Sequence, residues 1–511
     1  MLRLVTGLCS LGIAVGVIGL AGCGSDTDSA TVGTSTDRGT LLYDPPFRIA
    51  SLTAADFGAE LSAQAAGASL LAVAGQPACG VDFYHIEYNT VGGTGEKTTA
   101  SGALLVPTGA AAGCSGPRPI VLYAHGTQTD KTANLADITN TSNAEGALIA
   151  AVFAAHGFIV VAPNYAGYDT STLPYHPFLN GDQQSKDMID ALAAARSTLP
   201  HTMSSATSDS GKLFITGYSQ GGYVAMATHK ALQAAGVAVT ASAPMSGPYA
   251  LEAFGDAIFY GSVDIGSTVF GTMVASSYQH SYGNLYTTPT QVFEATYAAN
   301  VAADILPSAT PISTLFATGK LPQTALFNST TPVTGNGQLD AALAVPANPV
   351  FALGFGTSNL ITNDFRLSYV LDAVNNPDGA VPTPRPDLGL APAAAPANTL
   401  RQDLKTNDLR NWAPHSPMLL CGGDQDPTVF YSVNTGTMQA FWSTLPAGLV
   451  TVLDVNAPPN AANPFAPLQV GFQATLANLL ASGGQGAVVA NYHTTVAPFC
   501  TVAARGFFSQ F

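Results

Sequence analysis

A serine near the middle of the chain has the spacing of an activated nucleophile. It lies in Gly217-Tyr218-Ser219-Gln220-Gly221, which has the form G-x-S-x-G. The residues 212–216 before it are typical of a buried strand, and the residues 223–232 after it are typical of a helix. A tight turn between a strand and a helix exposes the serine hydroxyl, and the flanking glycines let the two elements pack closely. This context favours a nucleophilic Ser219 over a glycine-rich turn with an incidental serine.

Two backbone amides are candidates for binding an oxyanion beside this serine. The amide of Gln220 follows the nucleophile directly, where it can face the negative charge of a tetrahedral intermediate. A second donor is expected from the loop after the apolar run 119–124, where His125-Gly126-Thr127 offers the amide of Thr127. We expect His125 to hold this loop by hydrogen bonds rather than to transfer protons.

A serine hydroxyl is a weak nucleophile at neutral pH, so it needs a histidine base and a carboxylate that orients the base. For a serine on this kind of turn, the acid and then the histidine follow it along the chain. His493 lies after the last predicted strand and after the helix predicted over 468–481, where the base belongs. Asp424 and Asp426 both follow the strand predicted over 417–421 and are the two candidate acids.

From Tyr123 onward the chain resembles the α/β-hydrolase superfamily, and more narrowly the secretory lipases of the lipase A type. The resemblance rests on these segments: Tyr123-Ala124-His125-Gly126-Thr127, Val161-Ala162-Pro163-Asn164-Tyr165-Ala166-Gly167-Tyr168, His176-Pro177-Phe178, the serine motif with Gly222, and Trp412-Ala413-Pro414. Residues 423–429 also resemble the G-x-x-D-x-x-V acid turn of these enzymes, which favours Asp426 and leaves Asp424 as the rival. At Asn164 the family often has an aspartate.

The resemblance implies an α/β-hydrolase fold, with a mostly parallel central sheet flanked by helices, and ester hydrolysis without a cofactor. It also implies a helical lid before the acid-bearing strand. The alternation of strands and helices does stop after the strand predicted over 237–243 and resumes at 417–421, which predicts an inserted, mainly helical cap or else a separate domain. The predicted organisation is a signal peptide (1–23), a disordered tether (24–43), the first part of the hydrolase core (44–248), the cap (249–411) and the second part of the core (412–511).

The N-terminus predicts export. A short positive start is followed by an apolar stretch over 8–20 and then by Leu20-Ala21-Gly22-Cys23, which resembles a bacterial lipobox. Lipidation of Cys23 would anchor the protein to a membrane of the bacterial cell envelope, and an ordinary signal peptide with an incidental cysteine is the alternative. Four cysteines remain in the mature chain, and nearness in the expected fold favours the pairs Cys79–Cys114 and Cys421–Cys500 over free buried thiols.

Composition excludes other classes of function. The chain has 511 residues, of which only 10% are charged, and a net charge of −15. Nucleic acid is therefore an unsuitable partner, because no basic surface is available to neutralise phosphates. The sequence also lacks the spacing of zinc or phosphate-binding motifs, so we expect neither a metal nor a cofactor.

The sequence thus predicts an exported serine esterase or lipase that acts through Ser219, Asp426 and His493. Long-chain fats, short esters and polyesters all remain candidate substrates. A peptidase or amidase on the same fold, and a non-catalytic surface protein on a hydrolase scaffold, are the alternatives.

Overall fold

The computed structural model describes residues 31–32, 37–138, 140, 143–199, 206–382 and 384–511. Its centre is a nine-stranded sheet in the order β13-β12-β9-β8-β6-β7-β5-β4-β3. The strands from β13 to β7 pair in parallel, whereas β5, β4 and β3 pair antiparallel at one edge. The strands are β3 (Phe47–Leu52), β4 (Gly80–Val91), β5 (Lys97–Thr108), β6 (Gly116–Ala124), β7 (Ile159–Pro163), β8 (Thr207–Tyr218), β9 (Ala241–Met245), β12 (Met418–Gly422) and β13 (Val450–Asp454).

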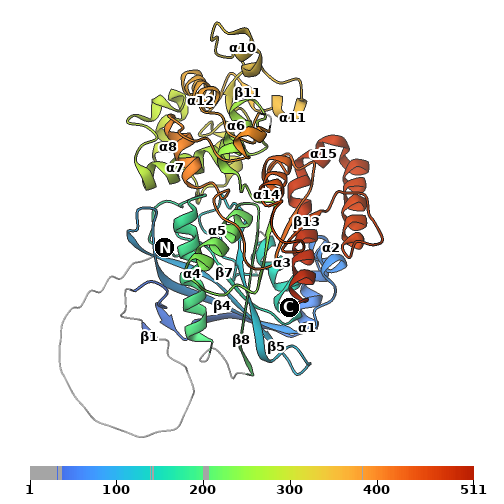
Figure 1. The fold of residues 1–511 in the computed structure, drawn as a ribbon. Coiled ribbons are helices and arrows are strands. Elements are labelled where there is room, and N and C mark those ends of the chain that lie inside the picture. Colours follow the sequence, from blue (N-terminus) through green and yellow to red (C-terminus); the bar gives the residue numbers. More distant parts are fainter. Residues whose placement is uncertain (1–30, 33–36, 139, 141–142, 200–205, 383) are drawn as a thin grey trace, which may run out of the picture.

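Helices cover both faces of this sheet, which is the α/β-hydrolase fold that the sequence predicts (Figure 1). Successive side chains of a strand point to opposite faces, so Leu122 and Val121 of β6 belong to different hydrophobic cores. One face packs against α4 (Gly181–Thr198) and α5 (Gln220–Ala234). The other face packs against α1 (Ala54–Ser62), α2 (Ala65–Ala74), α3 (Ala144–Val152) and α15 (Ala466–Phe508).

The segment between β9 and β12 is mainly helical, and Figure 1 shows its elements gathered as a layer above the sheet. Two very short strands, β10 (Phe327–Asn328) and β11 (Phe355–Gly356), pair in parallel within it. Its helices are α6 (Leu251–Phe259), α7 (Ser267–Tyr282), α8 (Ala295–Ala302), α9 (Ile312–Ala317), α10 (Gly337–Leu343), α11 (Pro349–Ala352), α12 (Asn363–Asn375) and α13 (Thr399–Thr406). We call this segment the cap.

The N-terminal part differs from the expectation of a loose tether up to residue 43. The backbone amides of Gly39 and Leu42 donate to the carbonyls of Asn89 and Glu87 on β4, so this stretch is docked on the sheet. Main-chain pairing, which composition does not reveal, explains the difference. The predicted signal peptide and Cys23 lie outside the described residues.

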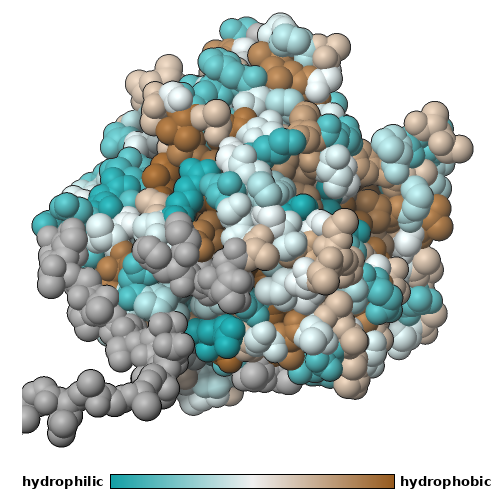
Figure 2. Space-filling model, turned by 90° about the horizontal axis from the view of Figure 1, so that it is seen from below, coloured by the Kyte–Doolittle hydropathy of each residue, from teal (hydrophilic) through white to brown (hydrophobic). Residues whose placement is uncertain are grey.

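Figure 2 shows hydrophilic and hydrophobic residues interspersed over the described part of the face seen from below. Among the described residues, no helix combines the length and the hydrophobicity that a membrane span needs.

Candidate active site

Ser219 lies on the sharp turn between β8 and α5, as its motif predicts. Its backbone has φ 59° and ψ −121°, a conformation that is strained for any residue except glycine. The turn is tight enough that a Cβ atom on Gly221 would lie 1.9 Å from the carbonyl oxygen of Ala124. Glycine at that position therefore lets α5 start directly against β6.

The structure brings Ser219, His493 and Asp426 together in one hydrogen-bonded line. The Nε2 atom of His493 lies 2.9 Å from the Ser219 hydroxyl oxygen, and its Nδ1 atom lies 2.6 Å from Asp426 Oδ2. An ionised carboxylate only accepts hydrogen bonds, so Nδ1 carries the proton and Nε2 accepts from the serine. The other oxygen of Asp426 accepts the amides of Thr428 and Val429, which fixes the carboxylate.

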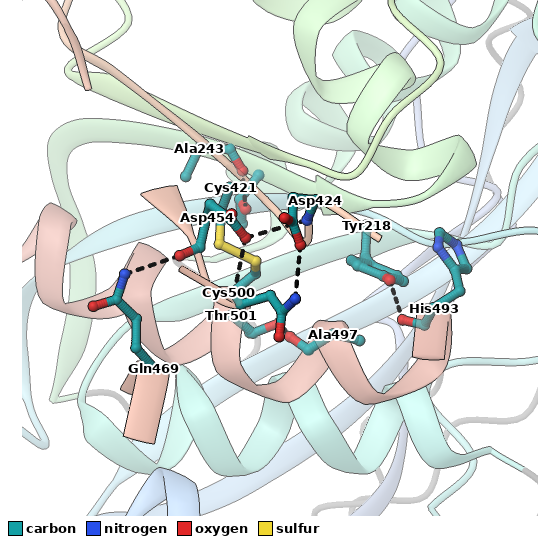
Figure 3. The surroundings of a disulfide bond; sticks show 12 residues. Tyr218, Ala243, Cys421, Asp424, Asp454, Gln469, His493, Ala497, Cys500 and Thr501 are labelled. Atoms are coloured by element: carbon teal, nitrogen blue, oxygen red, sulfur yellow. Dashed lines mark hydrogen bonds between the residues drawn. A yellow bond between two sulfur atoms is a disulfide. The ribbon is translucent and has the colours of Figure 1, made fainter. Parts of the chain in front are cut away.

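Asp424, the rival acid, does not face the histidine. Its Oδ1 accepts from the side chain of Asn456, and its backbone amide donates to Asp454. Figure 3 shows Asp424 turned toward Asp454 and away from the His493 ring. Asp424 thus belongs to the turn that joins β12 to the loop of Asp426.

His493 follows the helix predicted over 468–481, but it lies in a second helix that was not predicted from the sequence. The segment labelled α15 consists of two helices that meet at a kink at Gly484, where φ is 68° and ψ is −169°. The break falls in Ser482-Gly483-Gly484-Gln485-Gly486, and glycine at position 484 permits the positive φ. The backbone carbonyl of His493 accepts a hydrogen bond from the Tyr218 hydroxyl.

A disulfide ties the two parts of the site that are far apart in sequence. Cys421 at the end of β12 is bonded to Cys500 of α15, two helical turns after His493 (Figure 3). The second disulfide joins Cys79 and Cys114, so both favoured pairings are present. The cross-link between β12 and α15 holds the strand before Asp426 against the helix that carries His493.

The two candidate oxyanion donors lie at the same cavity as Ser219. Among the described residues, neither the Thr127 amide nor the Gln220 amide has a hydrogen-bond acceptor. Gln220 is fixed through its side chain, whose Nε2 donates to Nε2 of His176 over 2.8 Å. That ring stays neutral, because burial lowers the His176 pKa to about 3.

The loop that carries Thr127 is held by groups on both sides. His125 contacts two backbone carbonyls, that of Gly126 through Nδ1 and that of Asn164 through Nε2. Burial lowers the His125 pKa to about 4, although these carbonyl contacts oppose the shift. These contacts indicate that His125 fixes the position of the loop. Asn164, where the family often has aspartate, accepts the Leu135 amide with its side chain.

Sequence reasoning missed Glu145, which holds the same loop from α3. Its Oε1 accepts from the Tyr123 hydroxyl at 2.8 Å and from the Gly126 amide at 2.9 Å. Burial raises the Glu145 pKa to about 7, although both hydrogen bonds act to lower it. The available signal was that Glu145 is the one charged residue in the apolar helix over 144–152.

The raised pKa of Glu145 predicts a pH-dependent stability that glutamine would remove. In the unfolded chain this carboxyl ionises near pH 4.5, but in the folded protein it ionises near 7. The contribution of the Glu145 carboxyl to the free energy of unfolding is therefore complete below pH 4.5 and is lost as the pH rises to about 7. We expect the free energy of unfolding of Glu145→Gln, relative to the wild type, to rise between these pH values and to be constant above them. Urea denaturation from pH 4 to 8 measures this, and a difference that does not vary with pH would contradict it.

Comparisons with known proteins indicate that this chain is a hydrolase. The model of the prolyl oligopeptidase family matches residues 146–263. The crystal structure of a ligand-bound form of the rice cell wall degrading esterase LipA from Xanthomonas oryzae matches with a TM-score of 0.64 and 28% identity, over 92% of this chain and 98% of that chain. Another crystal structure of the same esterase gives a TM-score of 0.63 at the same identity and coverage. A comparison with curated proteins finds no match. This chain is a serine hydrolase with an α/β-hydrolase fold.

Proposed function

We propose that this protein is an exported carboxylic-ester hydrolase of the lipase or carboxylesterase type. The observation that carries the proposal is the line from Asp426 through His493 to Ser219, with the serine facing an apolar cavity. The likeness to an esterase at 28% identity over almost the whole chain supports the ester bond as the target.

In the proposed reaction, Ser219 attacks the ester carbonyl while Nε2 of His493 takes its proton. Asp426 orients the ring and stabilises the imidazolium that forms. The amides of Gln220 and Thr127 bind the oxyanion, and removal of one such donor typically costs about 10²–10³ in rate. His493 then protonates the leaving alcohol, and water hydrolyses the acyl-enzyme.

Two hollows meet at Ser219, and we assign one to each side of the ester. An apolar cavity of about 130 Å³ lies under the cap and is lined by Ser219 and Gln220 but not by His493. A cleft of about 730 Å³ on the other side is lined by both Ser219 and His493. His493 must reach the leaving oxygen, so the alcohol belongs in the cleft and the acyl group in the cavity. Phe270 of α7 lines both hollows.

Export and anchoring are part of the proposal. The two disulfides are compatible with an oxidising compartment. The lipobox-like residues ending at Cys23 support a lipid anchor in the cell envelope. Radiolabelled fatty acid should be incorporated into the wild type during expression in a bacterial host but not into Cys23→Ala, and labelling of both proteins would exclude this anchor.

A peptidase is the second candidate, because the prolyl oligopeptidase model matches the segment that contains Ser219. Hydrolysis of p-nitrophenyl esters from acetate to palmitate, measured beside hydrolysis of aminoacyl and prolyl p-nitroanilides, separates the two. We expect kcat/KM to be greatest for an ester whose acyl chain fits the cavity, with the anilides cleaved far more slowly. Turnover of the anilides alone would rule out the esterase.

A further inference from the structure

The apolar cavity under the cap contains one ionisable side chain among the described residues that line it. This is Asp264, which lies in the connection between α6 and α7 and is 5% exposed. The lining of the same cavity includes Phe254, Phe259 and Phe270. A carboxyl group in such surroundings is costly unless it has a partner.

Only one of the two oxygens of Asp264 has such a partner. The hydroxyl of Ser267 donates to Oδ1, whereas Oδ2 has no hydrogen-bond partner among the described residues. The Oε1 atom of Gln220, which also lines the cavity, is likewise buried and unpartnered in the described structure. The mostly apolar lining therefore includes two side chains that each have a buried polar atom without a hydrogen-bond partner among the described residues. Ligand sites are typically built in this way, from an apolar wall and a few polar groups that set specificity.

We propose that Asp264 recognises a hydroxyl group on the acyl part of the substrate. The proposal rests on the ester hydrolysis proposed above and specifies its substrate class: esters of hydroxylated acids. A hydroxyl both donates and accepts, so it can pair with the carboxyl in either protonation state. An ammonium group would pair only with the ionised form, and the enclosed apolar wall disfavours its charge.

The surroundings of Asp264 support a neutral partner. Burial raises its pKa to about 7, and the neighbouring carboxylate of Asp426 acts in the same direction. No lysine, arginine or histidine is among the described residues that line the cavity. The cap connection with Asp264 is held against the acid loop, because the Ile265 amide donates to the carbonyl of Pro427. Asp264 thus has a fixed position in the cavity that holds the acyl group.

The test compares hydroxylated and plain acyl groups in the same enzyme. The substrates are ethyl hexanoate and its 2-, 3-, 5- and 6-hydroxy derivatives, and the measured quantity is the ratio of kcat/KM for each hydroxy ester to that for ethyl hexanoate. In the wild type we expect this ratio to reach about 10–100 for at least one isomer, since a hydrogen bond to a charged or buried group has that effect. Asp264→Leu should reduce the ratio to about one, whereas Asp264→Asn, which keeps a donor and an acceptor, should retain most of it.

Asp364→Leu supplies the matched control, because Asp364 is an exposed cap residue on α12 and outside the cavity. It should keep the wild-type ratio. A wild type that prefers no hydroxy isomer would overturn the inference. The inference would also be overturned if Asp264→Leu lowered kcat/KM by the same factor for every ester, because Asp264 would then act through Asp426 or on the fold. If no ester is hydrolysed by the wild type, the proposed function fails first and the inference fails with it.

Discussion

Replacing Ser219 by alanine is expected to reduce kcat on every ester by about 10⁶-fold, as loss of a serine nucleophile does in a triad enzyme. The expectation follows from the geometry: no other described hydroxyl is within 2.9 Å of His493 Nε2. Circular dichroism and thermal melting of the variant should match the wild type, since only one oxygen atom is removed. Initial rates with the best p-nitrophenyl ester measure the loss. Residual activity above about one per cent of the wild type would contradict a nucleophilic Ser219.

The two aspartates of the acid loop form a matched pair of controls. Asp426→Asn should lower kcat by about 10⁴-fold, because an amide in place of the carboxylate favours the wrong tautomer of the histidine. Asp424→Asn should remain close to the wild type, because Asp424 bonds to Asn456 and not to His493. The opposite result would transfer the orienting role to Asp424.

Replacing Arg401 by methionine is expected to destabilise the protein by about 3–5 kcal/mol, the usual cost of removing one partner from a buried ion pair. Arg401 is fully buried on α13. It donates to both oxygens of Asp256 at 2.9 Å and to Asp372 at 2.8 Å, and it lies 3.3 Å from Glu252. Without the guanidinium, Asp256 and Asp372 would lose the cation that they bind. Chemical denaturation at pH 7 measures the free energy of unfolding.

An exposed pair provides the control for this cluster. Arg385 and Asp387 lie on the surface of the cap, at 2.7 Å from each other. Arg385→Met should leave the denaturation curve close to that of the wild type, as is usual for an exposed ion pair. Equal effects of the two substitutions would mean that the Arg401 cluster contributes little to stability.

The sequence predicted the elements that carry local signals. The strand, turn and helix around Ser219 follow from glycines and an apolar run, and strand β12 follows from the continuous apolar residues 417–421. The positions that it missed depend on contacts between distant segments. Glu145 meets Gly126 only because α3 packs against the end of β6, and His176 meets Gln220 across 44 positions of sequence. The structure places His493 against Asp426, in a second helix that starts after the kink at Gly484 and that was not predicted from the sequence.

The local sequence pattern also did not predict where some strands and helices begin and end. The strand predicted over 237–243 is β9 (Ala241–Met245), because residues up to Thr240 form the connection from α5 and only the later ones pair with β8 and β12. After the acid loop, a π-helical segment at Ser432–Gly436 continues directly into α14 (Thr437–Phe441). At β9, hydrogen bonding to neighbours overrides the local pattern.

The most direct test of the central claim is labelling of the intact protein with a fluorophosphonate, which reacts with an activated serine. We expect one phosphonyl group per wild-type chain by mass spectrometry, with the modified peptide containing Ser219. Ser219→Ala should take up none, and His493→Ala should react at a small fraction of the wild-type rate. A folded wild type that remains unlabelled, or a Ser219→Ala variant that is labelled as fast as the wild type, would contradict an active site built on Ser219, His493 and Asp426.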